Sequence, residues 1–536
     1  MAAAKAVAKA AKAGGKATGK GDEKAKTPKK RGGTATRTAK SKSPVQSPLA
    51  TAADAPIAVV HATAELAPFA RTGGLGEAVR TLARFQAKAG IDVTIVMPYY
   101  GDVARLAPPV QPLGSPFQVM VGGRPEEVSL LELVRPAGPP TPRVVFVASA
   151  TYFAREGIYG DANGDFSDNA RRYACFSLGV IEAIPRLSEG RVVVHAHDWH
   201  AALIPVYLRG VFADDPRYAS VASVLSVHNA GFQGHFPAET VADLGLPWSL
   251  YTMNHLEWYG RMNLLKGGMS FADAVVTVSP THADELRTEG GGFGLHDAFR
   301  ALGGRFGGIA NGIDQEEWDP ATDLHIVARY SRKDLSGKAS NKASLQRFFG
   351  LPKRAQTPLI AMSARMVYQK GLDLILGSGF LMLDAQFVFL GSGEPRYERT
   401  LLDLARRAPN RLGVQLNFTD RLEHRLLAGA DFCLMPSMYE PCGLTQMRAQ
   451  RYGTLPLARR VGGLADTIED GVTGFLFDEY TSDDFLKGAA RAMEAYRDPA
   501  TFVRMQREAM ARDFGWEHAE ARYREVYRFA AERRGA

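Results

Sequence analysis

The chain has 536 residues, of which 46% are hydrophobic and 23% charged, a composition typical of a globular protein and a length that favours two domains. No stretch approaches 18 consecutive apolar residues, so a membrane-spanning helix is excluded and no membrane association is expected. The three cysteines are too few for a disulfide framework and lack the spacing of a zinc site. A reducing, cytoplasmic location is therefore expected.

The basic charge is concentrated at the amino terminus. Residues 1–50 contain thirteen Lys and Arg and two acids, which leaves 52 basic and 55 acidic residues in the remainder. With no aromatic side chains, residues 1–55 are expected to form a disordered basic tail. Two roles of this tail are possible: an inert extension, or a segment that binds polyanions weakly and without specificity. A plastid transit peptide is an alternative, although the tail favours Lys and Ala over Arg and Ser.

Short apolar runs separated by segments of helical period predict parallel βαβ units on both sides of a linker at 306–335. We therefore expect an α/β fold with two Rossmann-like, doubly wound domains over 56–305 and 336–515, and ligands between the two sheets. The predicted strands are Ile57–Val60, Val93–Met97, Val144–Val147, Val192–His195, Val221–Val227, Val275–Val278, Leu359–Ser363, Gln386–Leu390, Gln415–Phe418, Phe432–Met435, Leu455–Leu457 and Gly474–Phe477.

A glycine-rich loop, TAELAPFARTGGLGE, follows the first predicted strand. Gly73 and Gly74 precede a helix, whose first amides favour phosphate and which a ligand can approach closely. Arg71 adds a planar cation that can hold a phosphate through two hydrogen bonds. An ordinary turn with a solvated arginine is the alternative.

The segments VVVHAHDWH and SVLSVHNAGFQ bring polar residues to the ends of two further strands. Asp198 follows the first strand, and capping of the next helix is the alternative to a functional role. His228 follows the second, where a packed or solvated histidine is the alternative. His195, His197 and His200 do not match known ligand spacing, so no metal is expected.

The second domain offers two cations and a carboxylate. Arg365 and Lys370 leave its first strand in SARMVYQKGL and could stabilise the charge of a departing diphosphate. Glu440 lies between two prolines in PSMYEPCGLTQ, and Gly443 opens a helix that runs to about Arg451. A solvated loop and a helix cap are the respective alternatives.

Taken in order, TGGL, HAHDWH, VHN, ARMVYQKG, EPCGLTQ and GTLPL…GGLADT are similar to motifs of the bacterial glycogen (starch) synthase family over about 57–529. The resemblance implies a GT-B architecture with a deep cleft and a last helix, 516–536, that returns to the first domain. It also implies a retaining glycosyltransferase that moves glucose from ADP-glucose to the non-reducing end of an α-1,4-glucan without a cofactor. A related enzyme using UDP-glucose or another acceptor is the alternative.

The resemblance also implies residue roles. Arg365 and Lys370 match the pair that stabilises the leaving diphosphate, and Glu440 matches the carboxylate that orients the donor glucose. His228 matches the histidine against the transferred sugar, and Asp198 an aspartate near the reacting centre. The remaining matches bind the donor: Glu65, Gly73, Gly74 and the amides of Gly443, Leu444 and Thr445.

The sequence departs from the family pattern in the glycine-rich loop. The family usually has KTGGLAD where this chain has RTGGLGE, so Arg71 replaces a lysine and Glu77 an aspartate. Arginine and lysine differ in how they hold phosphate, which leaves the donor nucleotide the less certain part of the expectation.

Overall fold

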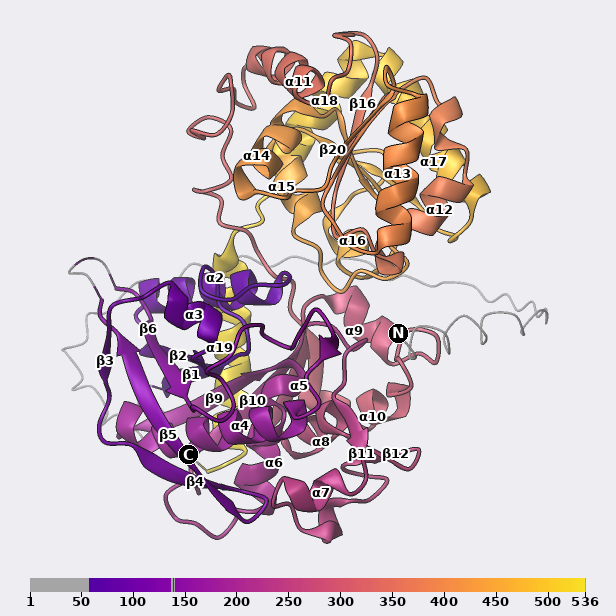
Figure 1. Ribbon diagram of the computed structural model, residues 1–536. Helices are drawn as coiled ribbons and strands as arrows, with labels where there is room; N and C mark the ends of the chain where they lie inside the picture. The colour runs from indigo at the N-terminus through magenta and orange to yellow at the C-terminus, as the bar shows by residue number, and fades with distance from the viewer. Residues whose placement is uncertain (1–56, 136–137, 139, 536) are drawn as a thin grey trace, which may run out of the picture. The chain divides into compact units, whose positions relative to one another are not determined.

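The computed structural model describes residues 57–135, 138 and 140–535 (Figure 1). The tail predicted over 1–55, with the polyanion binding and transit peptide considered for it, lies outside the described residues. No helix in the described part of the chain is long and apolar enough to cross a membrane.

The first sheet has the strand order β15-β14-β10-β9-β1-β2-β6-β5-β3, with β4 paired to β5. Its parallel strands are β1 (Ile57–Ala62), β2 (Val93–Pro98), β6 (Arg143–Ala148), β9 (Arg191–His197), β10 (Ala222–Val227), β14 (Ala274–Thr277) and β15 (Phe306–Gly308). The antiparallel strands β3 (Val110–Pro112), β4 (Phe117–Val121) and β5 (Arg124–Leu133) extend one edge and were not predicted. Small hairpins complete the strands: β7 (Gly160–Asp161), β8 (Gly164–Asp165), β11 (His235–Pro237), β12 (Glu257–Trp258) and β13 (Arg261–Asn263).

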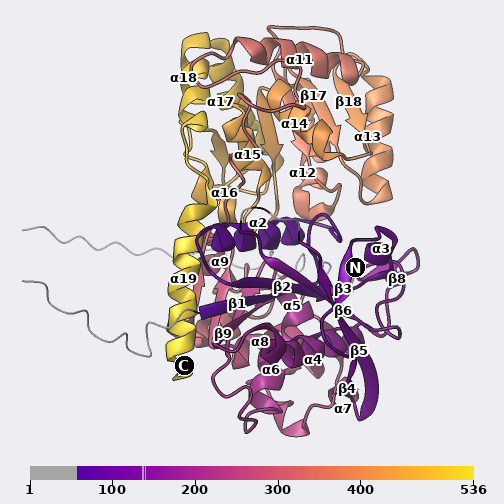
Figure 2. The same cartoon turned by 90° about the vertical axis from the view of Figure 1, so that its left-hand side faces the viewer.

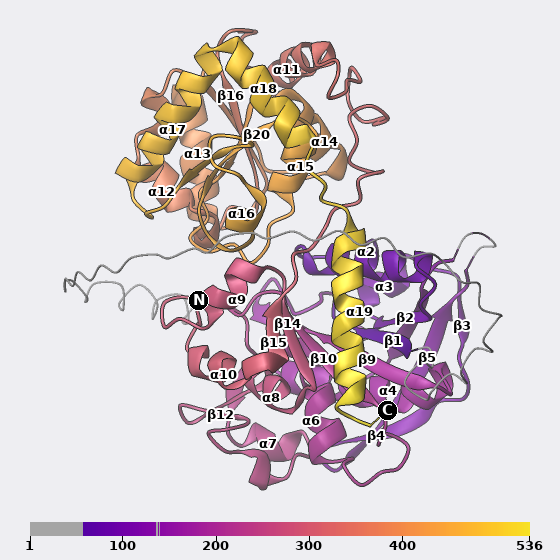
Figure 3. The same cartoon turned by 180° about the vertical axis from the view of Figure 1, so that it is seen from behind.

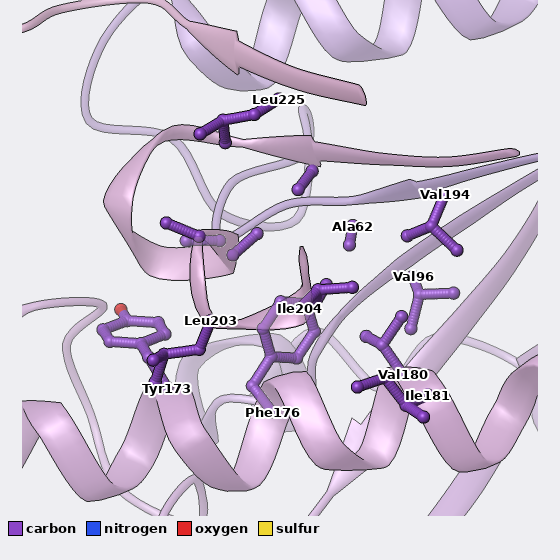
Figure 4. Close-up of a cluster of buried hydrophobic side chains, with 14 of the residues drawn as sticks. Ala62, Val96, Tyr173, Phe176, Val180, Ile181, Val194, Leu203, Ile204 and Leu225 are labelled. Atoms are coloured by element: carbon purple, nitrogen blue, oxygen red, sulfur yellow. The ribbon is translucent and has the colours of Figure 1, made fainter. Parts of the chain in front are cut away.

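Helices connect the strands of this sheet. They are α2 (Leu75–Lys88), α3 (Gly101–Arg105), α4 (Asn169–Leu187), α5 (Asp198–Ala201), α6 (Leu203–Gly210), α7 (Thr240–Asp243), α8 (Leu264–Phe271), α9 (Pro280–Leu286) and α10 (His296–Ala301). Figure 4 shows how α4 packs its apolar face toward the central strands. Six side chains in this contact have no exposed surface: Phe176, Val180 and Ile181 of α4, and Ala62, Val96 and Val194 of the strands. Burial of each large apolar side chain stabilises the fold by about 1.5–3 kcal/mol.

The second sheet is parallel throughout, in the order β18-β17-β16-β19-β20-β21. Its strands are β16 (Leu359–Ser363), β17 (Gln386–Leu390), β18 (Leu412–Gln415), β19 (Phe432–Met435), β20 (Leu455–Arg459) and β21 (Phe475–Phe477). The helices are α11 (Ser336–Phe348), α12 (Leu372–Gly377), α13 (Pro395–Arg407), α14 (Asp420–Gly429), α15 (Thr445–Arg451), α16 (Gly462–Thr467), α17 (Ser482–Arg497) and α18 (Pro499–Met510).

One predicted strand of this sheet is wrong in position. The prediction placed it at Gln415–Phe418, but β18 spans Leu412–Gln415. Leu412 is buried and pairs with Phe387, whereas Phe418 is 41% exposed, so the buried apolar residue and not the aromatic one marks the strand.

The last helix, α19 (Trp516–Glu532), packs on the first sheet. It contacts α2, β9 and β10, as Figures 2 and 3 show. Its buried side chains Trp516, Tyr523 and Tyr527 share a core cluster with Val193 and Val224. The aromatic residues thus repeat at the spacing of one helix face.

Candidate active site

Both sheets change strand order next to their first strand. In the second sheet β16 lies between β17 and β19, and in the first β1 lies between β2 and β9. The connection that follows β16 therefore runs to one side of the sheet, and the connection that follows its neighbour β19 runs to the other. A crevice between the two connections, at the carboxyl ends of these strands, is where a ligand can bind. The predicted site residues follow β16 and β19 in one sheet and β1, β9 and β10 in the other.

The loops after β16 and β19 are joined directly. The Met438 amide donates to the Gln369 carbonyl at 2.9 Å. Gly371 adopts a left-handed backbone (φ 77°), and a Cβ there would lie 2.1 Å from the Pro436 carbonyl oxygen. Only glycine therefore allows the two loops to pack this closely.

Lys370 and Glu440 form an ion pair across these loops. The Lys370 Nζ lies 2.6 Å from Oε2 of Glu440, whose side chain is 6% exposed. Ser437 Oγ donates to the same oxygen at 2.9 Å. Oε1 of Glu440 has no partner among the described residues. The sequence analysis gave Lys370 and Glu440 separate roles, whereas the structure brings them into contact.

Arg365 differs from Lys370 in its surroundings. Its side chain is exposed, and within the described ranges it makes no hydrogen bond or ion pair. Its positive charge acts to lower the pKa of the nearby Tyr439, but burial has the larger effect and raises that pKa. The loop after β16 therefore carries one cation paired with a carboxylate and one available to a ligand.

The turn after Glu440 places three amides at the start of α15. Gly443 is left-handed (φ 71°), Leu444 precedes the helix and Thr445 begins it. The first amides of a helix have no acceptor inside the helix and carry a partial positive charge. Glu440 does not cap this helix, because its side-chain partners among the described residues are Lys370 and Ser437.

Glu65 organises the glycine-rich loop after β1. Its carboxylate accepts hydrogen bonds from the Thr72 amide (2.9 Å), the Thr72 hydroxyl (2.6 Å), the Gly73 amide (3.3 Å) and the Tyr159 hydroxyl (2.7 Å). A Cβ on Gly73 or Gly74 would meet no protein atom within 4 Å. The Glu65 carboxylate thus fixes the loop through hydrogen bonds, and the side of the loop that carries the two glycines is free of atoms from the described residues.

The two residues that depart from the family pattern both form ion pairs with the second sheet's helices. Arg71 Nη2 lies 2.9 Å from Asp420 Oδ1 at the start of α14, and both side chains are at least a third exposed. Glu77 pairs with Arg448 of α15. Burial acts to raise the pKa of Glu77, but the guanidinium groups of Arg448, Arg80 and Arg71 together lower that pKa overall.

Asp198 is a strained and buried carboxylate. It follows β9 in a left-handed conformation (φ 56°) that few non-glycine residues adopt. Its Oδ1 accepts from the amides of His228 (2.7 Å) and Asn229 (3.4 Å), and it does not cap α5. Burial raises its pKa to about 7, although these two amides act in the opposite direction. Strain of this kind is typical of functional sites.

His228 directly follows β10 and lies beside Asp198. Its Nε2 lies 3.0 Å from Nδ1 of His197, and burial lowers its pKa to about 4. The Nδ1 of His228 makes no hydrogen bond to the described chain. His228 is therefore neutral at physiological pH and has one ring nitrogen available to a ligand.

A cluster of three histidines lies behind His228. One ring nitrogen from each of His61, His195 and His197 lies within 4.8 Å of the others. All six ring nitrogens have hydrogen-bond partners, namely Gln86, Tyr527, Ser226, His228 and each other. A metal ion would have to displace these bonds. His200, also singled out by its sequence position, stacks on Tyr159 instead.

The sequence analysis missed the residues that support the site from behind, above all His61, Gln86 and Tyr527. Their only sequence signal is a polar side chain on an otherwise apolar face of a strand or helix. Their contacts join residues up to 441 positions apart, which periodicity does not reveal.

Comparisons with known proteins match both halves of the chain. Residues 58–301 match the family model "Starch synthase catalytic domain", and residues 345–509 match "Glycosyl transferases group 1". The chain is 40% identical over 484 residues to glycogen synthase 2 of Geobacter sulfurreducens, covering 89% of this chain and 99% of that one. It is 41% identical over 481 residues to a glycogen synthase of an Anaeromyxobacter species, covering 88% and 99%.

Two solved structures are similar. The catalytic domain of starch synthase IV from Arabidopsis thaliana, bound to ADP and acarbose, has a TM-score of 0.80 at 30% identity, with coverage of 89% of this chain and 100% of that chain. Sucrose-phosphate synthase from Thermosynechococcus elongatus has a TM-score of 0.56 at 17% identity, with coverage of 88% and 98%, and supports the fold alone.

Two Rossmann-like sheets with polar loops at their switch points define a glycosyltransferase of the GT-B fold, as predicted. The similarity extends over nearly the whole length of the curated relatives. The chain belongs to the glycogen synthase family and transfers glucosyl units in glycogen synthesis.

Proposed function

We propose that this enzyme transfers glucose from ADP-glucose to the non-reducing end of an α-1,4-glucan with retention of configuration. The observation that carries the proposal is the Lys370–Glu440 pair beside the unpartnered Arg365 at the switch point of the second sheet. The ADP in the similar starch synthase structure supports the choice of nucleotide.

In this proposal Glu440 binds the sugar of the donor, and Lys370 and Arg365 act on its diphosphate. Glu440 is fixed through Oε2, so Oε1 can accept hydrogen bonds from the hydroxyls of the donor glucose. Lys370 uses one of its three protons on Glu440 and keeps two for the diphosphate. Arg365 and the first amides of α15 add positive charge where the leaving diphosphate becomes more negative.

Asp198 and His228 act from the first sheet, close to the glucose that is transferred. Asp198 fixes the turn that carries His228, because its carboxylate accepts hydrogen bonds from the backbone amides of His228 and Asn229. The acceptor hydroxyl attacks from the face that the diphosphate leaves, so no enzymic nucleophile is needed. Arg365 and Lys370 supply the charge that a metal would, and we propose that transfer needs neither metal nor cofactor.

The test is glucose incorporation into glycogen by the full-length protein, with labelled ADP-glucose and UDP-glucose assayed side by side and Glu440→Gln as the control. We expect faster transfer from ADP-glucose, unaffected by EDTA, and label that β-amylase releases as maltose from the non-reducing ends. Absence of transfer from either donor, or label that β-amylase does not release, would contradict the proposal.

A second donor is the alternative, and Arg71 is the observation that favours it. It replaces the usual lysine and is held by Asp420, so its charge is shared before any phosphate arrives. Clearly faster transfer from UDP-glucose in the same assay would establish this alternative.

Two further expectations concern the setting of the enzyme. A cytoplasmic location remains a prediction, which cell fractionation tests. Polyanion binding by the basic tail also remains a prediction. Deleting residues 1–50 should abolish retention on DNA at low salt and leave kcat unchanged.

A further inference from the structure

A continuous line of hydrogen bonds joins His228 to the last helix of the chain. His228 Nε2 lies 3.0 Å from His197 Nδ1, and His197 Nε2 lies 3.0 Å from His61 Nδ1. His61 Nε2 lies 2.7 Å from Oε1 of Gln86 on α2. Gln86 Nε2 then donates to the Tyr527 hydroxyl of α19 at 2.9 Å. Apart from His228, every member of this line is at most 2% exposed.

The three imidazoles of the line are neutral. Burial lowers the pKa of His61 and of His228 to about 4 and that of His197 well below its usual range. A neutral imidazole has one N–H and one bare nitrogen, so each ring donates one hydrogen bond along the line and accepts one. All bonds in the line must therefore run in the same direction.

The Gln86 amide determines that direction. Its Oε1 can only accept, so His61 must donate from Nε2 and accept at Nδ1. His197 must then donate from Nε2, and His228 must donate from Nε2 as well. The opposite orientation of the amide would reverse every one of these bonds.

Tyr527 is the second partner of the amide. Its hydroxyl accepts from Gln86 Nε2 and lies 2.8 Å from Nδ1 of His195, to which it can donate. His195 Nε2 then donates to Ser226 Oγ at 2.6 Å, and Ser226 is in turn hydrogen-bonded to Tyr523. The hydroxyl and the amide thus have complementary roles without an unsatisfied buried group.

We propose that Gln86 is a positioning residue that fixes His228 as the Nε2–H tautomer, so that its bare Nδ1 accepts a hydrogen bond from a hydroxyl of the donor sugar. The proposal rests on the proposed function for the identity of that sugar. It connects α19 to substrate recognition, because the Tyr527 hydroxyl accepts from the Gln86 amide in the observed orientation. A sugar hydroxyl that meets this nitrogen must act as the donor.

The first test observes the tautomer without any substrate. Long-range ¹H–¹⁵N spectra of the full chain labelled at its histidines distinguish protonated from bare ring nitrogens, and His228→Ala identifies the signals of His228. We expect Nε2 protonated and Nδ1 bare. In Gln86→Met, which keeps the volume but removes the acceptor, we expect a mixture of tautomers. Gln86→Glu should restore the parent pattern, because a carboxyl oxygen still accepts from His61.

The second test measures donor kinetics. Gln86→Met should lower kcat/KM for the donor about three- to tenfold, the range for one hydrogen bond. In a His228→Ala background the same change should have no further effect, since the two residues act through one contact. Tyr207→Phe is the matched control, because it removes a buried tyrosine hydroxyl that donates to the Leu244 carbonyl, outside this line. It should keep the parent kcat/KM and tautomer.

Several outcomes would overturn the proposal. His228 protonated at Nδ1 in the parent, an unchanged tautomer in Gln86→Met, or additive losses in the double variant would each do so. A zinc ion retained by the purified protein and lost in His61→Ala would do so too, because it would occupy the ring nitrogens. The expected tautomers in a protein that does not use ADP-glucose would contradict the proposed function alone.

Discussion

Asp198 is expected to lower the stability of the enzyme at neutral pH, and its replacement by asparagine should reveal this. The carboxylate is 8% exposed and has two amide donors, and its pKa is raised to about 7 from 3.8. Asparagine keeps the shape, tolerates the left-handed backbone and can accept the same hydrogen bonds, but it does not ionise.

The sign and size of the effect follow from this pKa. A carboxyl group whose pKa is higher in the folded than in the unfolded state favours folding most at low pH. That contribution is lost as the pH rises from about 4 to about 7. A rise of about three in pKa corresponds to ~4 kcal/mol, as an order of magnitude. Relative to the parent, Asp198→Asn should therefore gain stability by up to ~4 kcal/mol between pH 4 and pH 8.

Urea unfolding of both proteins at pH 4.5, 6, 7 and 8, followed by tryptophan fluorescence, gives this difference, in which the other titrating groups cancel. Asp165→Asn is the control, because Asp165 is exposed and makes no ion pair with the described chain. The same Asp198 variant should lose most of its kcat if the carboxylate acts near the reacting centre. A difference in stability that does not change with pH, or that falls as the pH rises, would refute the reasoning.

The other predictions concern the cations and the carboxylate that the proposed function places around the donor. Arg365→Ala, which breaks no ion pair, should lower kcat roughly 10²–10³-fold with an unchanged melting temperature; parent-like kcat would contradict its role. Lys370→Ala should lower kcat similarly and also cost about 3–5 kcal/mol in urea unfolding, because it leaves Glu440 buried without its cation. Glu440→Gln should lower kcat more than it raises the KM for ADP-glucose, and an unchanged kcat would rule out a transition-state contact. Arg71→Lys should stay within about tenfold of the parent kcat/KM, since both side chains place a cation near phosphate.

The fold could be predicted wherever burial makes a strand apolar throughout. Strands β16, β17 and β19 have the predicted bounds, because both faces of a parallel sheet are covered and the apolar run is continuous. β5, which lies between β6 and β3, was missed because only two of its ten residues are buried, so its sequence lacks such a run. The boundaries predicted for the domains and the linker remain predictions.

The candidate site could be predicted in its parts but not in its contacts. Loops at the carboxyl ends of strands are short and contain few apolar residues, so Asp198, His228, Arg365 and Glu440 stand out in the sequence. The contact between Lys370 and Glu440 does not, since it depends on the close packing of two loops that Gly371 permits. Sequence spacing shows which strand a residue follows. The partner that its side chain bonds to belongs to the loop after a neighbouring strand, and sequence spacing does not reveal that partner.

Both switch points contain a carboxylate that the fold would be more stable without. Glu440 is buried against a lysine and a hydroxyl, and Asp198 is buried in a left-handed turn where no cation of the described chain is bonded to it. Neither arrangement stabilises the core, since well-packed apolar residues would serve it at least as well. Both hold backbone or side-chain atoms in a fixed place before a ligand arrives. The cost in stability is therefore borne by the free enzyme, and under the proposed function the donor sugar would meet groups that need little further reorganisation.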